Sequence, residues 1–379
     1  MTDIYTKPTG SYISFMSNKV KTNGGINLAQ GIPGFMPPKE LLDILKDMVN
    51  MPFHQYAAGN GDPELVEAII SYHSNEQKIS PNQLLVVQGA TEALSLIYIY
   101  LKKELGTAFT TMAFDPVYEV YKNLPHIFDG NFVSYPLSSN SFNIDSIRLF
   151  IVENNVKLIY VGSPGNPYGL SYTKKQLNEL IKLSQELNFY IVIDAVYKDL
   201  YFHTPPYQPI DVNNNNLFYV NSFSKMLSIT GWRIGYFVCS EQNMTKIRSI
   251  HDYTGLCAPS LFQKALAKYL QTHNFGIKYL TKLRETLNNN YNFLSNELIK
   301  LGFTIPKTDG GYFVWAELPK GYSDGFKFTI DLYNNYKVAV IPGEHFSASC
   351  SNYIRFNVAR EFSEIENAVE QLKKFFANC

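Results

Sequence analysis

The sequence contains little cysteine, no excess charge of either sign and no long hydrophobic run. Its four cysteines, Cys239, Cys257, Cys350 and Cys379, are widely spaced and form no CxxC pair, which argues against a disulfide framework or a zinc site. Lysine plus arginine and aspartate plus glutamate number 33 each, so the charge indicates no nucleic-acid partner. The apolar runs are far shorter than the roughly 20 residues that span a bilayer. The N-terminus lacks a signal-peptide core, which predicts a cytoplasmic protein without a membrane partner.

The length and the order of apolar segments predict two domains. A chain of 379 residues exceeds the usual size of one domain. Between about residues 80 and 240, apolar strands alternate with helices, which predicts an α/β domain with a mostly parallel, doubly wound sheet. From about residue 275, a long helix precedes short strands and a final helix, as in a smaller α+β domain. We expect an arm and part of the small domain in residues 1–50, the large domain in 51–275 and the C-terminal small domain in 276–379.

The stretch NSFSKMLSITGWRIGY, which follows an apolar strand at residues 217–220, carries the strongest chemical signal. It places Ser222, Ser224, Lys225 and then Arg233 after the end of that strand. Two hydroxyls, a lysine and an arginine there suit a phosphate and an amine nucleophile. A desolvated amine forms Schiff bases with carbonyls. Pyridoxal 5'-phosphate (PLP) brings both an aldehyde and a phosphate. From these residues alone, a solvated loop remains the alternative.

Four further apolar strands, predicted at residues 84–88, 109–114, 158–161 and 189–193, also end in residues suited to a ligand. Those residues are Gly89, Ala90, Thr91, Tyr118, Asn166, Asp194 and Tyr197. Strand carboxyl ends share one edge of a doubly wound sheet, so we expect these side chains to meet there. A glycine before a helix start lets an anion approach free N–H groups. A buried Asp194 needs a cation, such as a protonated pyridine nitrogen. Two alternatives stay open: Asp194 could cap a helix or turn, and Tyr118 could be a packed aromatic residue in a turn.

The S-x-S-K and G-W-R motifs resemble the cofactor-lysine motif of the class I aminotransferases of fold type I, and the resemblance covers nearly the whole chain. It implies a PLP-dependent transferase that moves the amino group of an L-amino acid to a 2-oxo acid. It implies that Lys225 carries PLP and acts as general base and then acid, with Asp194 and Tyr197 as catalytic partners. The other cofactor contacts that the resemblance implies in the same chain are Gly89, Ala90, Thr91, Tyr118, Asn166, Ser222, Ser224 and Arg233.

The segment INLAQGIPGF at residues 26–35 resembles the opening of the kynurenine and methionine aminotransferase branch. This resemblance implies aromatic amino acids, methionine or similar substrates, with Gly31 and Asn166 near the substrate. Arg355 interrupts an apolar strand and would bind the substrate α-carboxylate bidentately, although a structural ion pair remains the alternative. The family also implies that Tyr56 reaches the phosphate of the neighbouring subunit's cofactor. We therefore expect a homodimer with shared active sites.

Three positions depart from the family pattern, and two other functions stay open. Gly34, Tyr168 and Ala195 stand where aspartate, threonine and glutamate are usual. The same site would also suit a PLP-dependent C–S β-lyase. A non-catalytic regulator with this fold usually carries a DNA-binding domain ahead of it, and the residues before Gly31 leave no room for one. The sequence names neither the amino acid nor the 2-oxo acid.

Overall fold

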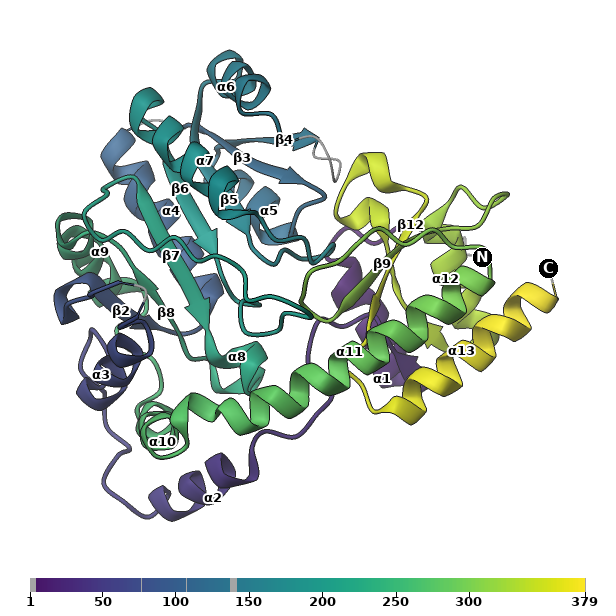
Figure 1. Ribbon diagram of the computed structural model, residues 1–379, viewed down its shortest axis with the longest axis horizontal. Helices are drawn as coiled ribbons and strands as arrows, with labels where there is room; N and C mark the ends of the chain where they lie inside the picture. The colour runs from purple at the N-terminus through teal and green to yellow at the C-terminus, as the bar shows by residue number, and fades with distance from the viewer. Residues whose placement is uncertain (1–4, 76, 107, 137–141, 379) are drawn as a thin grey trace.

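The computed structural model describes residues 5–75, 77–106, 108–136 and 142–378. Its largest sheet has the strand order β2-β8-β7-β6-β5-β3-β4 (Figure 1). The strands are β2 (Leu84–Val87), β3 (Thr110–Asp115), β4 (Asn131–Pro136), β5 (Val156–Gly162), β6 (Tyr190–Asp194), β7 (Leu217–Ser222) and β8 (Gly235–Val238). Strand β8 runs antiparallel to both of its neighbours, and the remaining pairs are parallel. The predicted mostly parallel α/β fold is therefore confirmed.

Helices cover both faces of this sheet (Figure 1). They are α3 (Pro63–Tyr72), α4 (Ala90–Leu105), α5 (Glu119–Ile127), α6 (Ile144–Glu153), α7 (Lys174–Leu187), α9 (Glu241–Thr254) and α10 (Ser260–Thr272), with the short α8 (Phe223–Met226) after β7. Along β2, Leu84 and Val86 belong to one buried cluster, and Leu85 and Val87 belong to another. Successive side chains of a strand point to opposite faces, so a strand buried on both faces must be apolar throughout.

Several local signals act as the sequence predicts. Asp62 caps α3 by accepting from two backbone N–H groups, and Pro63 occupies the first turn. Thr173 and Gln176 form a capping box at the start of α7. Residues 303–305 form no strand, and Thr304 makes only an isolated bridge to Glu317. Pro306 follows at once and has no N–H with which to extend a ladder.

The C-terminal part of the chain forms a smaller layer beside the large sheet. Its sheet has the order β11-β12-β9, and a separate pair joins β1 to β10. The strands are β1 (Ile26–Asn27), β9 (Phe313–Glu317), β10 (Val338–Ala339), β11 (Ile341–Pro342) and β12 (Tyr353–Asn357). The helices are α1 (Tyr12–Asn23), α11 (Ile277–Lys300), α12 (Gly325–Tyr336) and α13 (Phe362–Ala377), whereas α2 (Lys39–Met48) lies beside α10 (Figure 1). Figure 1 shows α11 running from beside α10 to beside α13. Because β1 pairs with β10, the N-terminal segment packs with the C-terminal part.

Three expectations about absent features can be compared with the described residues. Cys239, Cys257 and Cys350 are free thiols there, and Cys379 lies outside the described part. No group of three or more histidine, cysteine, aspartate or glutamate side chains among the described residues could hold a metal ion. Within the same residues, every helix is too short or too polar to cross a bilayer.

Candidate active site

The carboxyl-end loops of the large sheet and the N- and C-terminal segments enclose a cavity of about 270 Å³. The residues predicted from sequence that line it are Gly31, Ala90, Thr91, Tyr118, Asn166, Asp194, Tyr197, Ser222, Ser224, Lys225, Arg233 and Arg355. Gly89 lies next to this lining, immediately before α4. Tyr56 does not line the cavity, and its side chain is 83% exposed. The structure thus brings together groups from five strand ends and from both ends of the chain.

Lys225 lies in the short helix that follows β7, with its amine inside the cavity. Its Nζ donates a hydrogen bond of 2.8 Å to the carbonyl oxygen of Gly31. Burial lowers the pKa of Lys225 to about 8, and the positive charges of Arg355 and Arg233 add to this effect. The charge of Asp194 opposes it only in part. A fraction of this amine is therefore unprotonated near neutral pH and able to act as a nucleophile.

Asp194 ends β6 as a buried carboxylate without a bonded cation among the described residues. Its Oδ2 accepts a hydrogen bond of 2.7 Å from the hydroxyl of Tyr121, and its Oδ1 accepts one of 3.2 Å from the backbone N–H of Val196. Burial raises the pKa of Asp194, while these two hydrogen bonds and the charge of Lys225 partly oppose the rise. A cation placed at this carboxylate would relieve the cost of burying it.

A group of donors gathers where β2 and β7 end. The Ser222 and Ser224 hydroxyls lie 2.8 Å apart, and both residues are buried. Gly89 has a φ of 85°, and α4 begins after it with no side chain capping its free N–H groups. A Cβ at Gly89 would lie 2.5 Å from Nη2 of Arg233, so only glycine permits this approach. Hydroxyls, a guanidinium and a helix N-terminus together form a binding site for a phosphate.

Arg355 is fully buried in β12 and is held by neutral groups. Its Nη1 donates to Oδ1 of Asn166 at 2.8 Å, and its Nη2 donates to the carbonyl oxygen of Ala29 at 2.6 Å. The guanidinium carbon lies 4.2 Å from the centroid of the Phe313 ring and 4.9 Å from that of Phe346. Burial lowers the pKa of Arg355 to about 10. The alternative, a structural ion pair, is absent among the described residues, which leaves this cation available to a carboxylate ligand.

Sequence reasoning missed two tyrosines of the site. Tyr121 bonds Asp194 and lies one helical turn beyond Tyr118, with the two ring centroids 5.5 Å apart. The spacing of three residues on a helix was a usable signal, because such residues share a face. The hydroxyl of Tyr312 donates to the carbonyl oxygen of Gly31 at 2.8 Å, and its ring meets Tyr197 edge to face at 5.2 Å. No local pattern pairs Tyr312 with Gly31, since they lie far apart in the chain.

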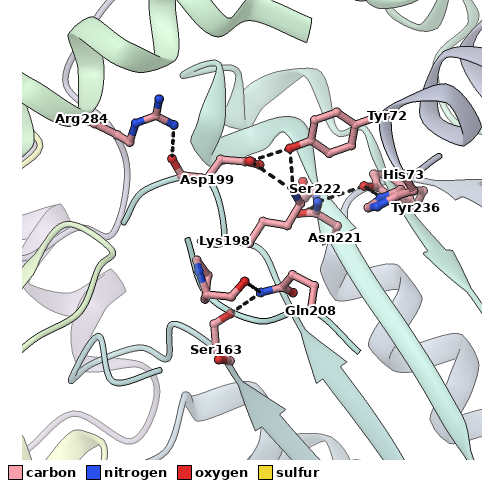
Figure 2. Close-up of polar contacts among 11 residues, drawn as sticks. Tyr72, His73, Ser163, Lys198, Asp199, Gln208, Asn221, Ser222, Tyr236 and Arg284 are labelled. Carbon is pink, nitrogen blue, oxygen red and sulfur yellow. Dashed lines mark hydrogen bonds and ion pairs between the residues drawn. The ribbon is translucent and has the colours of Figure 1, made fainter. Parts of the chain in front are cut away.

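A second polar network anchors the loop that carries Tyr197. Figure 2 shows the amine of Lys198 directed at Tyr72 and Asp199. Its Nζ lies 2.6 Å from the Tyr72 hydroxyl and 3.2 Å from Oδ1 of Asp199. Arg284 of α11 donates to the Asp199 carbonyl oxygen at 3.3 Å. This network joins the loop after β6 to α3 and α11, and thereby positions Tyr197.

A similar network supports the loop that carries Lys225 (Figure 2). The side chain of Asn221 accepts from the backbone N–H of Ser222 at 2.7 Å and donates to the Tyr236 hydroxyl at 3.0 Å. That hydroxyl lies 2.7 Å from Nε2 of His73. These buried bonds fix the turn between β7 and α8.

The fold and the site together define a PLP-dependent transferase of fold type I. Residues 23–372 match the family described as aminotransferase class I and II, and the chain belongs to that family. A probable aspartate aminotransferase of Methanocaldococcus jannaschii is 29% identical over 370 residues, which cover 94% of each chain. An aromatic aminotransferase of Arabidopsis thaliana is 28% identical, covering 84% of this chain and 81% of its own. A Methanococcus jannaschii protein, described as similar in its active site to kynurenine aminotransferases, has a TM-score of 0.85 at 22% identity and covers 99% of this chain and 100% of its own.

The family membership establishes the chemistry of the site. The protein is a transaminase that uses PLP and acts on amino acids and 2-oxo acids as small-molecule substrates. The cavity fits this cofactor, because it offers a phosphate site at the start of α4, a buried amine at Lys225 and an unpaired carboxylate at Asp194. The membership does not decide which amino acid is the donor, since the relatives include enzymes for aspartate and for aromatic amino acids.

Proposed function

We propose that this enzyme transfers the amino group of an L-amino acid with an uncharged side chain, such as an aromatic residue or methionine, to a 2-oxo acid. The observation that carries the proposal is the inventory of cations in the cavity. Among the described lining residues, these are Lys225, Arg233 and Arg355. In this proposal each of the three binds either the cofactor or the α-carboxylate of the substrate. None of them is therefore free to bind a second carboxylate on the substrate side chain. The aromatic aminotransferase relative and the kynurenine-aminotransferase-like structure support the same assignment to a kynurenine- and methionine-aminotransferase-like branch.

In this proposal the cofactor residues divide by the part of PLP that they hold. Ser222, Ser224, Arg233 and Thr91 hold the phosphate, beside the start of α4. Asp194 keeps a proton on the ring nitrogen, because a buried carboxylate is stabilised by a facing cation. When bound, PLP supplies an aldehyde that links to amines and a cationic ring that accepts electrons from the substrate α-carbon.

The remaining ring contacts complete this assignment. Tyr118 would lie against the ring, and Tyr197 and Asn166 would donate to its phenolic oxygen. Ala90 and Gly89 allow the backbone to approach the phosphate.

The substrate is held by its α-carboxylate and loses its α-proton to Lys225. Arg355 and Asn166 bind the carboxylate, with the backbone of Gly31 beside them. The amine of Lys225 accepts the proton in its neutral form and returns it as a general acid, for which a pKa near the working pH is favourable. The Gly31 carbonyl oxygen, which accepts from Lys225 and from Tyr312, holds the amine in place.

We further propose a homodimer in which Tyr56 enters the partner's cavity. Tyr56, Tyr253 and Leu256 are exposed hydrophobic residues. Gly59, close to Tyr56 in sequence, lies against the carbonyl oxygen of Leu256, so these exposed residues come from adjoining segments. Sedimentation velocity would measure the oligomeric state, and Tyr56→Phe should weaken PLP binding without dissociating the dimer. A monomer with full activity would contradict this assembly.

We also propose that residues 51–275 form the cofactor-binding domain, that residues 276–379 form the C-terminal small domain, and that residues 1–50 supply an arm and part of that small domain. All seven strands of the large sheet lie between Leu84 and Val238, and β1 pairs with β10 of the C-terminal segment.

The function is tested by labelling and by product analysis. Borohydride reduction of the holoenzyme followed by peptide mapping should place the pyridoxyl label on Lys225. A panel of amino-acid donors with an added 2-oxo acid should then give amino-group transfer, fastest for donors with uncharged side chains. Release of pyruvate and ammonia from a cysteine conjugate without transfer would instead identify a C–S β-lyase. A label on another lysine would overturn the assignment of Lys225.

A further inference from the structure

Glu119 places a second carboxylate in the cavity, in addition to Asp194. It is the first residue of α5 and directly follows Tyr118. Among the described lining residues, Glu119 and Asp194 are the acidic ones. The lining also includes Ile13 of α1 and Ile32 of the segment after β1. The cavity therefore contains the Glu119 carboxylate and two apolar side chains, none of which is assigned to the cofactor or to the substrate α-carboxylate.

A hydroxyl and an imidazole nitrogen from different segments lie against this carboxylate. The hydroxyl of Ser11 donates to Oε1 of Glu119 at 3.2 Å. Nε2 of His345 lies 3.1 Å from Oε2. A carboxylate offers about four acceptor positions, so these contacts leave others free. Ser11 precedes α1 and His345 follows β11, so Glu119 links α5 to both segments.

Glu119 is ionised and lies within electrostatic reach of the substrate-binding arginine. Burial raises the pKa of Glu119, but the contacts with His345, the Ser11 hydroxyl and the charge of Arg355 outweigh it and hold the pKa below its ordinary value. In turn, Glu119 raises the pKa of Arg355 against the lowering effect of burial. A substrate held by Arg355 through its α-carboxylate therefore feels the negative charge of Glu119.

We propose that Glu119 is a specificity-determining residue that rejects substrates with a second carboxylate and accepts a hydrogen bond from a donor on an uncharged substrate side chain. The apolar part of that side chain contacts Ile13 and Ile32. This inference rests on the proposed aminotransferase function and sharpens its substrate class. Like charges in a partly desolvated site repel strongly, whereas a hydroxyl or amide donor gains a charge-assisted hydrogen bond. The preferred donors are then uncharged amino acids whose side chains end in such a group.

The test is a Glu119→Gln variant, which keeps the size of the side chain and removes its charge. For the holoenzyme, kcat/KM for aspartate or glutamate relative to phenylalanine should rise by about tenfold to a hundredfold. A binding measurement without turnover accompanies it. The ratio of the dissociation constants of succinate and 3-phenylpropionate, measured by calorimetry, should shift in favour of succinate by a similar factor.

Two variants separate the charge of Glu119 from its structural contacts. Glu344→Gln makes the same change at a nearby carboxylate that bonds Tyr12 and Lys7 outside the cavity lining, and it should leave both ratios unchanged. His345→Gln removes the imidazole ring beside Glu119 but keeps the Glu119 carboxylate, so both ratios should stay the same or turn further against dicarboxylates. If Glu119 acted only by holding the segments together, the Glu119 and His345 variants would shift the ratios in the same direction.

The outcomes distinguish this inference from the proposed function. Unchanged ratios in Glu119→Gln, or parallel shifts in His345→Gln, would overturn the role of Glu119 while wild-type transamination of uncharged donors persisted. A wild-type enzyme that transaminated no amino acid would overturn the proposed function itself, and the calorimetric ratio would still report on Glu119.

Discussion

Two buried lysines follow neighbouring strands of the large sheet and have opposite surroundings. Lys198 comes after β6 and Lys225 after β7. The amine of Lys198 lies 3.2 Å from the carboxylate of Asp199 and 2.6 Å from the Tyr72 hydroxyl (Figure 2). The amine of Lys225 donates to one backbone carbonyl, and no carboxylate among the described residues lies within ion-pair distance of it.

The difference shows how one residue type serves structure at one place and chemistry at the other. The amine of Lys198 donates to a hydroxyl and to a carboxylate, so it acts as a fixed hydrogen-bond donor. A buried ammonium beside two guanidinium groups is destabilised, and the pKa of Lys225 falls to about 8. Lys198 is thus suited to anchoring the Tyr197 loop, and Lys225 is suited to nucleophilic attack.

Replacing each lysine by alanine gives the largest expected contrast. Lys225→Ala should lower kcat by about 10⁴-fold or more, because it removes both the cofactor anchor and the proton-transferring group. Lys198→Ala should stay within about tenfold of the wild type, because it acts through the position of Tyr197. Steady-state kinetics with a saturating 2-oxo acid would measure both, and similar losses would show that the two lysines are not functionally distinct.

The next contrast concerns the carboxylates near the two lysines. Asp194→Asn removes the charge that would hold the cofactor ring protonated, and we expect kcat to fall by about 10²- to 10³-fold. Asp199→Asn should leave kcat within a few-fold. The experiment is to compare the two variants at saturating PLP. Near-normal turnover in Asp194→Asn would remove this residue from the proposed chemistry.

For the free energy of unfolding we expect the reverse order, with replacement of Lys198 costing more than replacement of Lys225. Lys198→Met leaves the largely buried Asp199 carboxylate without its cation, although the Tyr72 hydroxyl still donates to it, and we expect the free energy of unfolding to fall by about 2–3 kcal/mol. The double change of Lys198→Met with Asp199→Asn should recover part of this loss. Urea unfolding of the apoenzyme would provide the values, with Lys225→Met as the control, which should be neutral or stabilising because it removes a destabilised charge. A Lys225→Met variant less stable than Lys198→Met would contradict the comparison.

The smallest effect is a dependence on pH. With a pKa of about 8 instead of the ordinary 10.5, about one-tenth of Lys225 is unprotonated at pH 7, against about one in three thousand otherwise. Because the neutral amine is the form that attacks an aldehyde, the rate of covalent PLP attachment to the apoenzyme should rise about tenfold per pH unit below pH 8. Above pH 8 it should level off. Stopped-flow absorbance would record the profile, and a continued rise to pH 10 would contradict the lowered pKa.

Much of the cofactor side of the site was predictable, because its signals are local. A strand followed by glycine, serine, aspartate or lysine places a polar group at a sheet edge, and the sheet order then collects Thr91, Asp194 and Lys225 at one cavity. Arg355 was also predicted as a site residue, because a cation within an apolar strand needs an anionic partner, and the structure places it in the same cavity.

The sequence by itself therefore determined the fold class and the family, since periodicity and strand-end motifs depend on short stretches of the chain. Only the tertiary structure decided which distant groups share an environment. It placed Glu119 between Ser11 and His345, bonded Tyr121 to Asp194, and gave Lys198 a carboxylate that Lys225 lacks. The physical reason is that burial and neighbouring charge set the pKa and reactivity of a side chain, and both arise from segments that lie far apart in the chain.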